Sequence, residues 1–270
     1  MQTVLTIAGF DPSSGAGVTA DLMVFAAHSL FGTSAITALT VQSTVGVRAN
    51  HPVSSEILRE TLDCLQEDLP PAGIKIGMLG SAANVEVVSG YLESIRRGKG
   101  ARIPVVLDPV LVSSSGRELL DMWGVTVLRE RLLPLVDWIT PNLGELSRLT
   151  GLNLHLRDEV LGAARILQAH VAGLGVLATG GHLEPPDDLV LTPTGEEIWL
   201  PGERVETRAT HGTGCAFSSA LLSRLVLGDA PADAARVAKE YVANALRTAV
   251  PRGTGHGPMN HLWPLIAPQD

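Results

Sequence analysis

The stretch His211-Gly-Thr-Gly-Cys215 is the strongest candidate for chemistry in this sequence. Two glycines in front of an apolar helical pattern let backbone N–H groups converge on an anion, and the helix dipole favours negative charge at that point. Such a nest stabilises the charge that develops on a phosphoryl group in transfer. The stretch is neither a P-loop nor a dinucleotide-binding fingerprint, because it lacks the lysine motif of one and the third glycine of the other. A glycine-rich cap on a packing helix is the alternative.

Cys215 is expected at the start of that helix. The helix dipole lowers the pKa of a thiol there, so the side chain can take a proton from a substrate hydroxyl or hold that hydroxyl in line. A small packing residue is the alternative for this cysteine.

Asn142 and Glu145 form a second constellation, directly after an apolar run. Three residues apart on a first helical turn, they share one face and can hold a hydrated Mg²⁺, which takes few protein ligands. The alternative is a capping box, in which the same two side chains only begin the helix. Asp108 is a further candidate ligand for a metal or its water, although the Pro109 after it also suits a plain turn.

The segment from Ala8 to Gly17 carries a third cluster, with Asp21 shortly after it. Glycines at positions 9, 15 and 17 allow a backbone to approach a ligand closely. A simple turn into a helix is the alternative.

Short apolar runs alternate with helical patterns along the whole chain. Strands are expected at 3–9, 33–42, 73–79, 104–108, 136–140 and 174–179, a hairpin at 189–200, and helices at 17–30, 54–69, 83–97, 142–150, 158–172, 214–227 and 230–250. This alternation predicts one α/β domain over residues 1–270, with a mostly parallel sheet covered on both faces. Ligands bind beyond the carboxyl ends of such strands, where the candidate residues fall.

Composition excludes several classes of protein. A net charge of -8 argues against nucleic acid as a partner, and the basic residues at 96, 97, 99 and 102 are interpreted as a solvated loop. No apolar run reaches the roughly 20 residues of a membrane span. The two cysteines, Cys64 and Cys215, predict no disulfide framework and fit a reducing cytoplasm. Cys64 is expected to be a buried apolar residue.

Together these segments resemble the ribokinase-like superfamily, and within it the hydroxymethylpyrimidine/phosphomethylpyrimidine kinases of thiamine biosynthesis. The resemblance runs in order from Ile7 to His261. It rests on residues 8–17, Ala20-Asp-Leu22, Thr37-Ala-Leu-Thr-Val-Gln42, Lys75-Ile-Gly-Met-Leu79, Leu107-Asp108, Thr140-Pro-Asn-Leu-Gly-Glu145, Gly180-Gly-His182, His211-Gly-Thr-Gly-Cys215 and His256-Gly-Pro-Met-Asn-His261. Sugar kinases of the superfamily carry Asp at the position of Cys215, whereas its pyrimidine kinases carry Cys.

The resemblance implies a three-layer α/β/α ribokinase-like fold, a homodimer, and ATP-dependent phosphorylation of hydroxymethylpyrimidine and its monophosphate. Cys215 would face the substrate's hydroxymethyl or phosphate group, with Gly212, Thr213 and Gly214 as the anion hole. The pyrimidine would lie near Gly9, Ala16, Asp21, Gln42, Met78 and Val110. Asn142, Glu145 and Asp108 would organise Mg²⁺ and its waters, and the ATP would lie by Thr179, Gly181 and Asn142.

Three positions depart from the family pattern. Thr179 stands where relatives have a lysine that reaches the ATP phosphates, and the loop Val112-Ser-Ser-Ser-Gly116 lacks another lysine. Phe10 replaces a common serine. Arg117 is a candidate to supply a missing cation, on spacing alone. Two other functions therefore stay open: a kinase for pyridoxal or a similar vitamin, and a pyrimidine-binding sensor with little catalysis.

Overall fold

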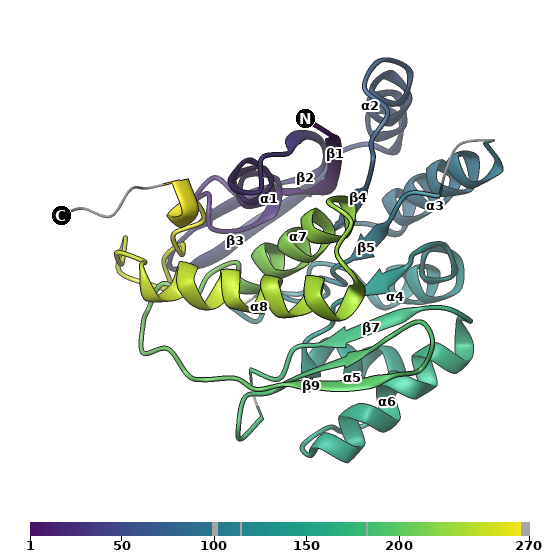
Figure 1. Ribbon diagram of the computed structural model, residues 1–270. Coiled ribbons are helices and arrows are strands. Elements are labelled where there is room, and N and C mark those ends of the chain that lie inside the picture. The colour runs from purple at the N-terminus through teal and green to yellow at the C-terminus, as the bar shows by residue number, and fades with distance from the viewer. Residues whose placement is uncertain (99–101, 114, 182, 266–270) are drawn as a thin grey trace.

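The computed structural model describes residues 1–98, 102–113, 115–181 and 183–265. Its centre is a nine-stranded sheet with the order β3-β2-β1-β4-β5-β6-β7-β8-β9 (Figure 1). The strands are β1 Thr3–Phe10, β2 Phe31–Ser43, β3 Gly46–Pro52, β4 Ile74–Ile76, β5 Val105–Leu107, β6 Trp138–Ile139, β7 Gly175–Ala178, β8 Asp188–Leu191 and β9 Glu197–Leu200. The six strands from β2 to β7 pair in parallel, and only β3, β8 and β9 run antiparallel to their neighbours. The predicted mostly parallel sheet is confirmed.

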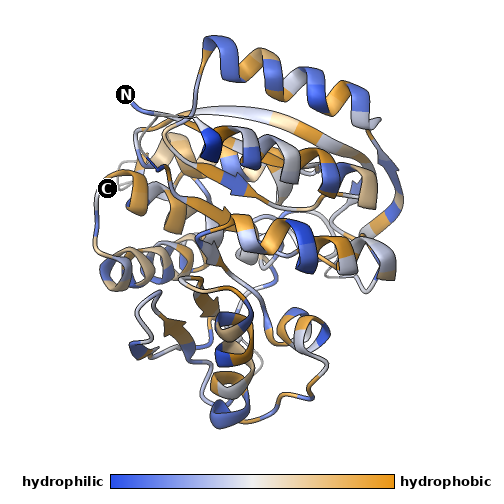
Figure 2. Ribbon diagram, turned by 90° about the vertical axis from the view of Figure 1, so that its right-hand side faces the viewer, coloured by the Kyte–Doolittle hydropathy of each residue, from blue (hydrophilic) through white to orange (hydrophobic). Residues whose placement is uncertain are grey.

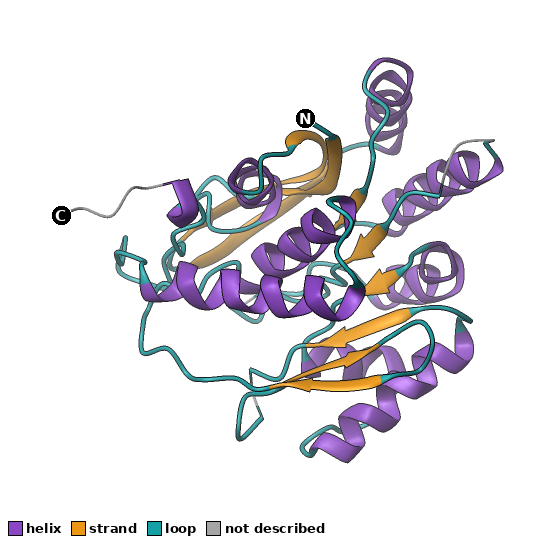
Figure 3. Cartoon of the chain, viewed as in Figure 1, coloured by secondary structure: helices purple, strands orange, loops and turns teal. Residues whose placement is uncertain are grey.

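Helices cover both faces of the sheet, so the predicted three layers are confirmed (Figure 3). The helices are α1 Gly17–Ala27, α2 Ser55–Asp68, α3 Ala82–Arg97, α4 Met122–Val127, α5 Leu143–Thr150, α6 Arg157–His170, α7 Thr213–Val226 and α8 Pro231–Arg247. One apolar core joins the sheet to α2 through α6, and another joins it to α1, α7 and α8. No helix in the described ranges is both long and apolar enough to cross a membrane.

The local sequence explains most element boundaries. β1 is buried at every position from Val4 to Gly9, as expected for a parallel strand covered on both faces. Ser54 and Ser81 cap α2 and α3 through side-chain oxygens that accept backbone N–H bonds. Most helices alternate hydrophilic and hydrophobic stretches along their length (Figure 2), so they turn one apolar stripe to the core, whereas α1 is apolar nearly all round.

Two parts of the fold were not predicted. β3 has the sequence Gly-Val-Arg-Ala-Asn-His-Pro, in which only four residues alternate apolar and polar, and it forms as an edge strand because β2 pairs with it. The helical segment from Met122 to Leu135 was also missed. The prediction for Cys64 was wrong, since this thiol is exposed on α2.

Candidate active site

The carboxyl ends of the parallel strands open into one cavity of about 1400 Å³. Loops after β1, β4, β5, β6 and β7 line it, together with the end of β2 and the start of α7. The sequence-predicted residues in its wall are Gly9, Ala16, Gln42, Met78, Asp108, Val110, Asn142, Glu145, Thr179, Gly181, Gly212, Thr213, Gly214 and Cys215. The structure therefore brings all predicted site residues together except Asp21.

The predicted anion-hole loop, residues 211–214, is held in a conformation that requires glycine. Gly212 caps α7 with a positive φ of 83°, and a Cβ atom on it would lie 1.8 Å from the carbonyl oxygen of Gly15. Gly214 is exposed to the cavity next to the Asp108 carboxylate. The N-terminus of α7 thus presents its unpaired N–H groups to the cavity, as an anion site requires.

The C-terminal part of the chain supports this loop. The N–H of His211 donates to the Gly257 carbonyl at 3.1 Å, and His211 forms a parallel bridge with Pro258. The buried ring of His261 donates from Nε2 to the Gly15 carbonyl oxygen at 3.2 Å. Segments from both ends of the sequence therefore meet around the anion hole.

Cys215 lies on the first turn of α7 and lines the cavity, but its thiol is not activated. Burial raises the pKa of Cys215 to about 12, and the nearby Lys75 cation lowers it too little to compensate. The sequence predicts a lowered pKa, whereas burial and the charges of Asp108 and Asp21 raise it. At neutral pH the group is a thiol, which can donate a hydrogen bond but is a poor proton acceptor.

Alkylation should reveal this difference between the two cysteines. At pH 8 iodoacetamide should modify Cys215 roughly 50-fold more slowly than Cys64, because far less of the Cys215 thiol is ionised, which its greater nucleophilicity only partly offsets. Peptide mass spectrometry over time measures both rates. Equal rates would show that Cys215 is ionised in the folded protein.

Asp108 and Glu145 place two buried carboxyl groups near each other. Burial raises the pKa of Asp108 to about 6, although Lys75 opposes the shift. Burial and the negative charge of Asp108 both raise the pKa of Glu145 well above its ordinary range. A divalent cation would relieve this repulsion, and oxygen donors are those that Mg²⁺ prefers. Within the ranges that the structure describes, no three His, Cys, Asp or Glu side chains gather as a metal cluster.

The capping-box interpretation of Asn142 and Glu145 is confirmed. The Asn142 N–H donates to Glu145 Oε2 at 2.9 Å, and the Glu145 N–H donates to Asn142 Oδ1 at 3.0 Å. The same turn lies beside Thr179, whose N–H donates to the Pro141 carbonyl at 2.9 Å. Capping does not exclude a second use, because both side chains also line the cavity.

Asp21 does not line the cavity, contrary to its predicted place beside the substrate. Its carboxylate is fully buried and accepts from Lys75 Nζ at 2.9 Å, from Ser219 Oγ at 2.8 Å and from Thr6 Oγ1 at 2.6 Å. Burial favours a neutral Lys75 amine, but the Asp21 carboxylate outweighs this and raises the pKa of Lys75. The charges of this buried pair affect the pKa values of Cys215 and Asp108.

Replacing Lys75 by methionine should lower the free energy of unfolding by about 3–5 kcal/mol, because it leaves the Asp21 carboxylate buried without its cation. Urea denaturation followed by circular dichroism measures the loss. Arg224→Met is the matched control, since it breaks a half-exposed pair with Asp229 and should cost far less. A loss in Lys75→Met no larger than in the control would contradict the expectation.

The far end of the cavity mixes apolar and charged side chains and was not predicted from the sequence. It lies between the segment after β9 and one face of α8. Its apolar residues are Leu200, Pro201, Val205, Val242, Ala243 and Leu246, and its charged residues are Glu203, Arg236, Lys239, Glu240 and Arg247. Lys239 closes this end by donating to Asp188 Oδ2 at 2.7 Å, while Asp188 Oδ1 accepts from the Gly180 N–H at 2.8 Å. The apolar stripe on α8 can be recognised in the sequence and indicates a packing face, but the sequence does not show what that face contacts.

Arg117 does not supply a cation to the cavity, so that sequence-based suggestion was wrong. Its guanidinium donates to the Arg48 carbonyl at 2.6 Å and lines a separate, smaller pocket beside β3. Ser113 lines the main cavity, whereas Ser115 contacts Val47 on β3. Ser114, Lys99 and His182, which entered the predictions, lie outside the described residues.

A family model described as phosphomethylpyrimidine kinase matches residues 11–260, which include almost every residue of this cavity. The chain belongs to this family. Like other phosphomethylpyrimidine kinases, it has the ribokinase-like α/β fold.

Individual relatives agree with the family. The chain is 40% identical over 266 residues to a hydroxymethylpyrimidine/phosphomethylpyrimidine kinase of Haemophilus influenzae, with 97% of each chain covered. It is also 40% identical to a thiamine biosynthesis bifunctional protein of Geobacter sulfurreducens, over 96% of this chain and 52% of that one. A pyridoxal kinase of Staphylococcus aureus, solved in complex with ADP, superposes with a TM-score of 0.87 at 28% identity, covering 97% and 94% of the two chains.

Proposed function

We propose that this kinase transfers the γ-phosphoryl group of ATP to 4-amino-5-hydroxymethyl-2-methylpyrimidine and then to its monophosphate, in thiamine biosynthesis. One observation carries the proposal: the anion-hole loop and Cys215 open into the same cavity as Gln42 and Met78. The loop and Cys215 suit a phosphoryl group and a hydroxyl, whereas Gln42 and Met78 suit a small polar heteroaromatic ring. The family and its pyrimidine kinases at up to 40% identity support this substrate.

In the proposed mechanism the chain mainly positions and stabilises. The N–H groups at the start of α7 hold the phosphoryl oxygens, and the Cys215 thiol orients the substrate oxygen. Phosphoryl transfer through a loose transition state needs little help from a base, which agrees with a thiol that stays protonated. Asp108 and Glu145, with Asn142, are the residues that would hold Mg²⁺, which when bound neutralises charge on the phosphate oxygens.

Gln42 and Met78 would recognise the pyrimidine. The Gln42 amide can both donate to and accept from an aminopyrimidine edge, and Met78 offers a polarisable contact for the ring. Gly9 makes room for Met78, because a Cβ atom on Gly9 would lie 2.5 Å from the Met78 methyl group. The apolar side chains at the end of the cavity beside α8 offer a surface for the adenine of ATP.

Mass spectrometry of products tests the proposal most directly. The protein is incubated with hydroxymethylpyrimidine, ATP and Mg²⁺, and the expected products carry one and then two phosphates. Pyridoxal is the competing substrate, because a pyridoxal kinase shares this fold closely. Equal or better turnover of pyridoxal would overturn the proposed choice of substrate. Tight pyrimidine binding without ADP release would indicate a pyrimidine-binding sensor.

Replacing Thr179 by lysine should raise turnover or tighten ATP binding by a few-fold, because Thr179 lines the cavity where family members carry a cation. Steady-state kinetics with varied ATP measures the change, and Thr179→Met is the control for side-chain length. No difference between the two variants would mean that another group already fills the place of the cation.

The proposal includes a homodimer in the cytoplasm. β2 exposes large apolar side chains near the sheet edge, namely Phe31, Leu39 and Val41, at about half of their full surface. Exposed apolar side chains on β2, above all the neighbouring Leu39 and Val41, suit contact with a second copy of the chain. Light scattering in solution distinguishes a dimer of 28.4 kDa subunits from a monomer.

A further inference from the structure

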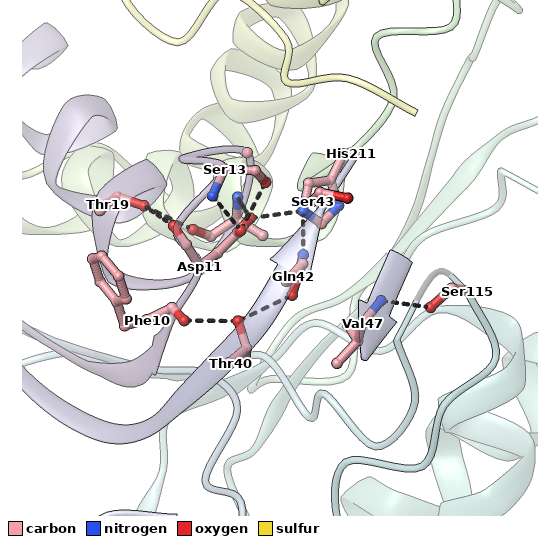
Figure 4. Close-up of polar contacts among 12 residues, drawn as sticks. Phe10, Asp11, Ser13, Thr19, Thr40, Gln42, Ser43, Val47, Ser115 and His211 are labelled. Carbon is pink, nitrogen blue, oxygen red and sulfur yellow. Dashed lines mark hydrogen bonds and ion pairs between the residues drawn. The ribbon is translucent and has the colours of Figure 1, made fainter. Parts of the chain in front are cut away.

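Asp11 and the ring of His211 form a polar cluster at the cavity wall with Gln42, and the mechanism above gives neither Asp11 nor this ring a role. His211 Nε2 lies 2.7 Å from Asp11 Oδ2 and 2.8 Å from the amide nitrogen of Gln42 (Figure 4). Thr40 Oγ1 holds the other end of the amide, at 3.3 Å from Gln42 Oε1, and donates to the Phe10 carbonyl at 3.0 Å. The three residues come from the loop after β1, the end of β2 and the loop before α7.

The cluster has little room to rearrange. A Cβ atom on Gly15 would lie 2.2 Å from the His211 ring, so the ring packs directly on that backbone. Gly212 is equally close to Gly15 from the other side. Asp11 is fixed as well, because its carboxylate also accepts from the Ser13 N–H at 2.8 Å and the Ala16 N–H at 3.0 Å.

These contacts determine where the proton of His211 lies. Burial tends to raise the pKa of Asp11, but hydrogen bonds from His211 and Ser13 lower it below its ordinary value. An ionised Asp11 can only accept, so the ring must carry a proton on Nε2 to bond with it. The neighbouring atom of Gln42 then faces an N–H donor.

A half turn about the last side-chain bond exchanges the oxygen and nitrogen of Gln42 without moving other atoms. With nitrogen toward His211, two donors face each other at 2.8 Å. With oxygen toward His211, the amide oxygen shares the single Nε2–H of the ring with Asp11. The amide nitrogen then donates to Thr40, which has a free lone pair because it donates to Phe10. Only the second arrangement places no two donors face to face.

We propose that Asp11 and His211 are positioning residues that set the orientation of the Gln42 amide, and thereby select which hydrogen-bonding edge of a heteroaromatic substrate the site accepts. The proposal rests on the proposed function in placing that substrate beside Gln42. The fixed amide has one remaining N–H and one remaining oxygen lone pair for the ligand, in a fixed order. An amino-pyrimidine edge offers a donor next to an acceptor, whereas its 4-oxo counterpart offers the reverse.

The test compares kcat/KM for 4-amino-5-hydroxymethyl-2-methylpyrimidine and for its 4-oxo analogue. The wild-type chain should prefer the amino compound, and Asp11→Asn should lower that preference about 10-fold or more, as expected for one misdirected hydrogen bond. Thr40→Val frees the other end of the amide and should act in the same direction. Asp229→Asn breaks a carboxylate ion pair at the far end of α7 and should leave the preference unchanged.

A second measurement needs no substrate. Long-range ¹H–¹⁵N NMR, with His211 assigned by its loss in His211→Asn, should show the ring protonated at Nε2 in the wild-type chain and in Asp229→Asn. A ring protonated only at Nδ1 would overturn the proposal. So would folded Asp11→Asn and Thr40→Val variants that slow both substrates equally, since that result marks a purely structural cluster.

The two measurements also separate this proposal from the proposed function. If the wild-type chain phosphorylates neither pyrimidine, the proposed function fails, and the proton position in the NMR spectrum still decides whether Asp11 orients His211. Calorimetric binding of the two compounds then replaces kcat/KM as the measure of preference.

Discussion

Replacing Cys215 by alanine is expected to lower kcat by about 100-fold or more, while the affinity for the pyrimidine stays within a few-fold. The thiol lies on the first turn of α7 and lines the cavity, where the proposed mechanism holds the hydroxyl that attacks the phosphoryl group. Removing it leaves the cavity wall and the Gln42 contacts in place, so binding should survive. A coupled ADP-release assay and calorimetry measure the two quantities separately.

Cys64→Ala is the matched control, since that thiol is exposed on α2 and should be dispensable. Because burial raises the pKa of Cys215 to about 12 in the folded protein, the thiol stays protonated through neutral and mildly basic pH. Ionisation of this thiol should therefore add no rise to kcat between about pH 7 and 9. The pH profiles of kcat for the wild-type chain and for Cys215→Ser should have the same shape over that range. Undiminished activity in Cys215→Ala would remove the thiol from catalysis.

Gly212→Ala should lower kcat by about 100-fold or more and also lower the melting temperature. The new methyl group would lie 1.8 Å from the Gly15 carbonyl oxygen, at a backbone φ of 83° that disfavours any side chain. The anion-hole loop must therefore move, and its N–H groups lose their aim at the phosphoryl oxygens. Steady-state kinetics and thermal denaturation measure the two effects.

Gly162→Ala provides the comparison for this substitution. Gly162 lies inside α6 with no atom within 4 Å of an added Cβ, so alanine should leave activity intact and stabilise the helix by about 0.5–1 kcal/mol. Wild-type kcat in Gly212→Ala would mean that the loop tolerates the shift and that its backbone does not form the anion hole.

The sequence predicts the fold well wherever an element carries its own signal. β1 and α7 are apolar enough to be recognised alone, and the ends of most elements agree within a few residues. β3 could not be found in this way, because its pairing with β2 rather than its composition makes it a strand. An edge strand of this kind depends on its partner strand, and the sequence alone does not show which strands pair.

The site was predicted by position more accurately than by chemistry. Fourteen of the fifteen predicted residues line one cavity, because the carboxyl ends of parallel strands meet at one edge. The prediction for Asp21 failed because a motif shows which residues recur but not which way a side chain points. The Asp21 side chain points at Lys75. The prediction for the pKa of Cys215 failed for a related reason. The start of the helix is visible in the sequence, whereas the burial of the thiol is not.

The support that Gly257 and His261 give to the anion hole has a consequence for how the protein is made. All residues that line the cavity are synthesised before them, and N-terminal elements fold first as a chain leaves the ribosome. The sheet can therefore assemble while the loop at 211–214 still lacks these contacts. We expect a chain that ends before Gly257 to keep the sheet and to hold the loop less firmly, so that the last step in forming the proposed phosphate site waits for the C-terminal segment.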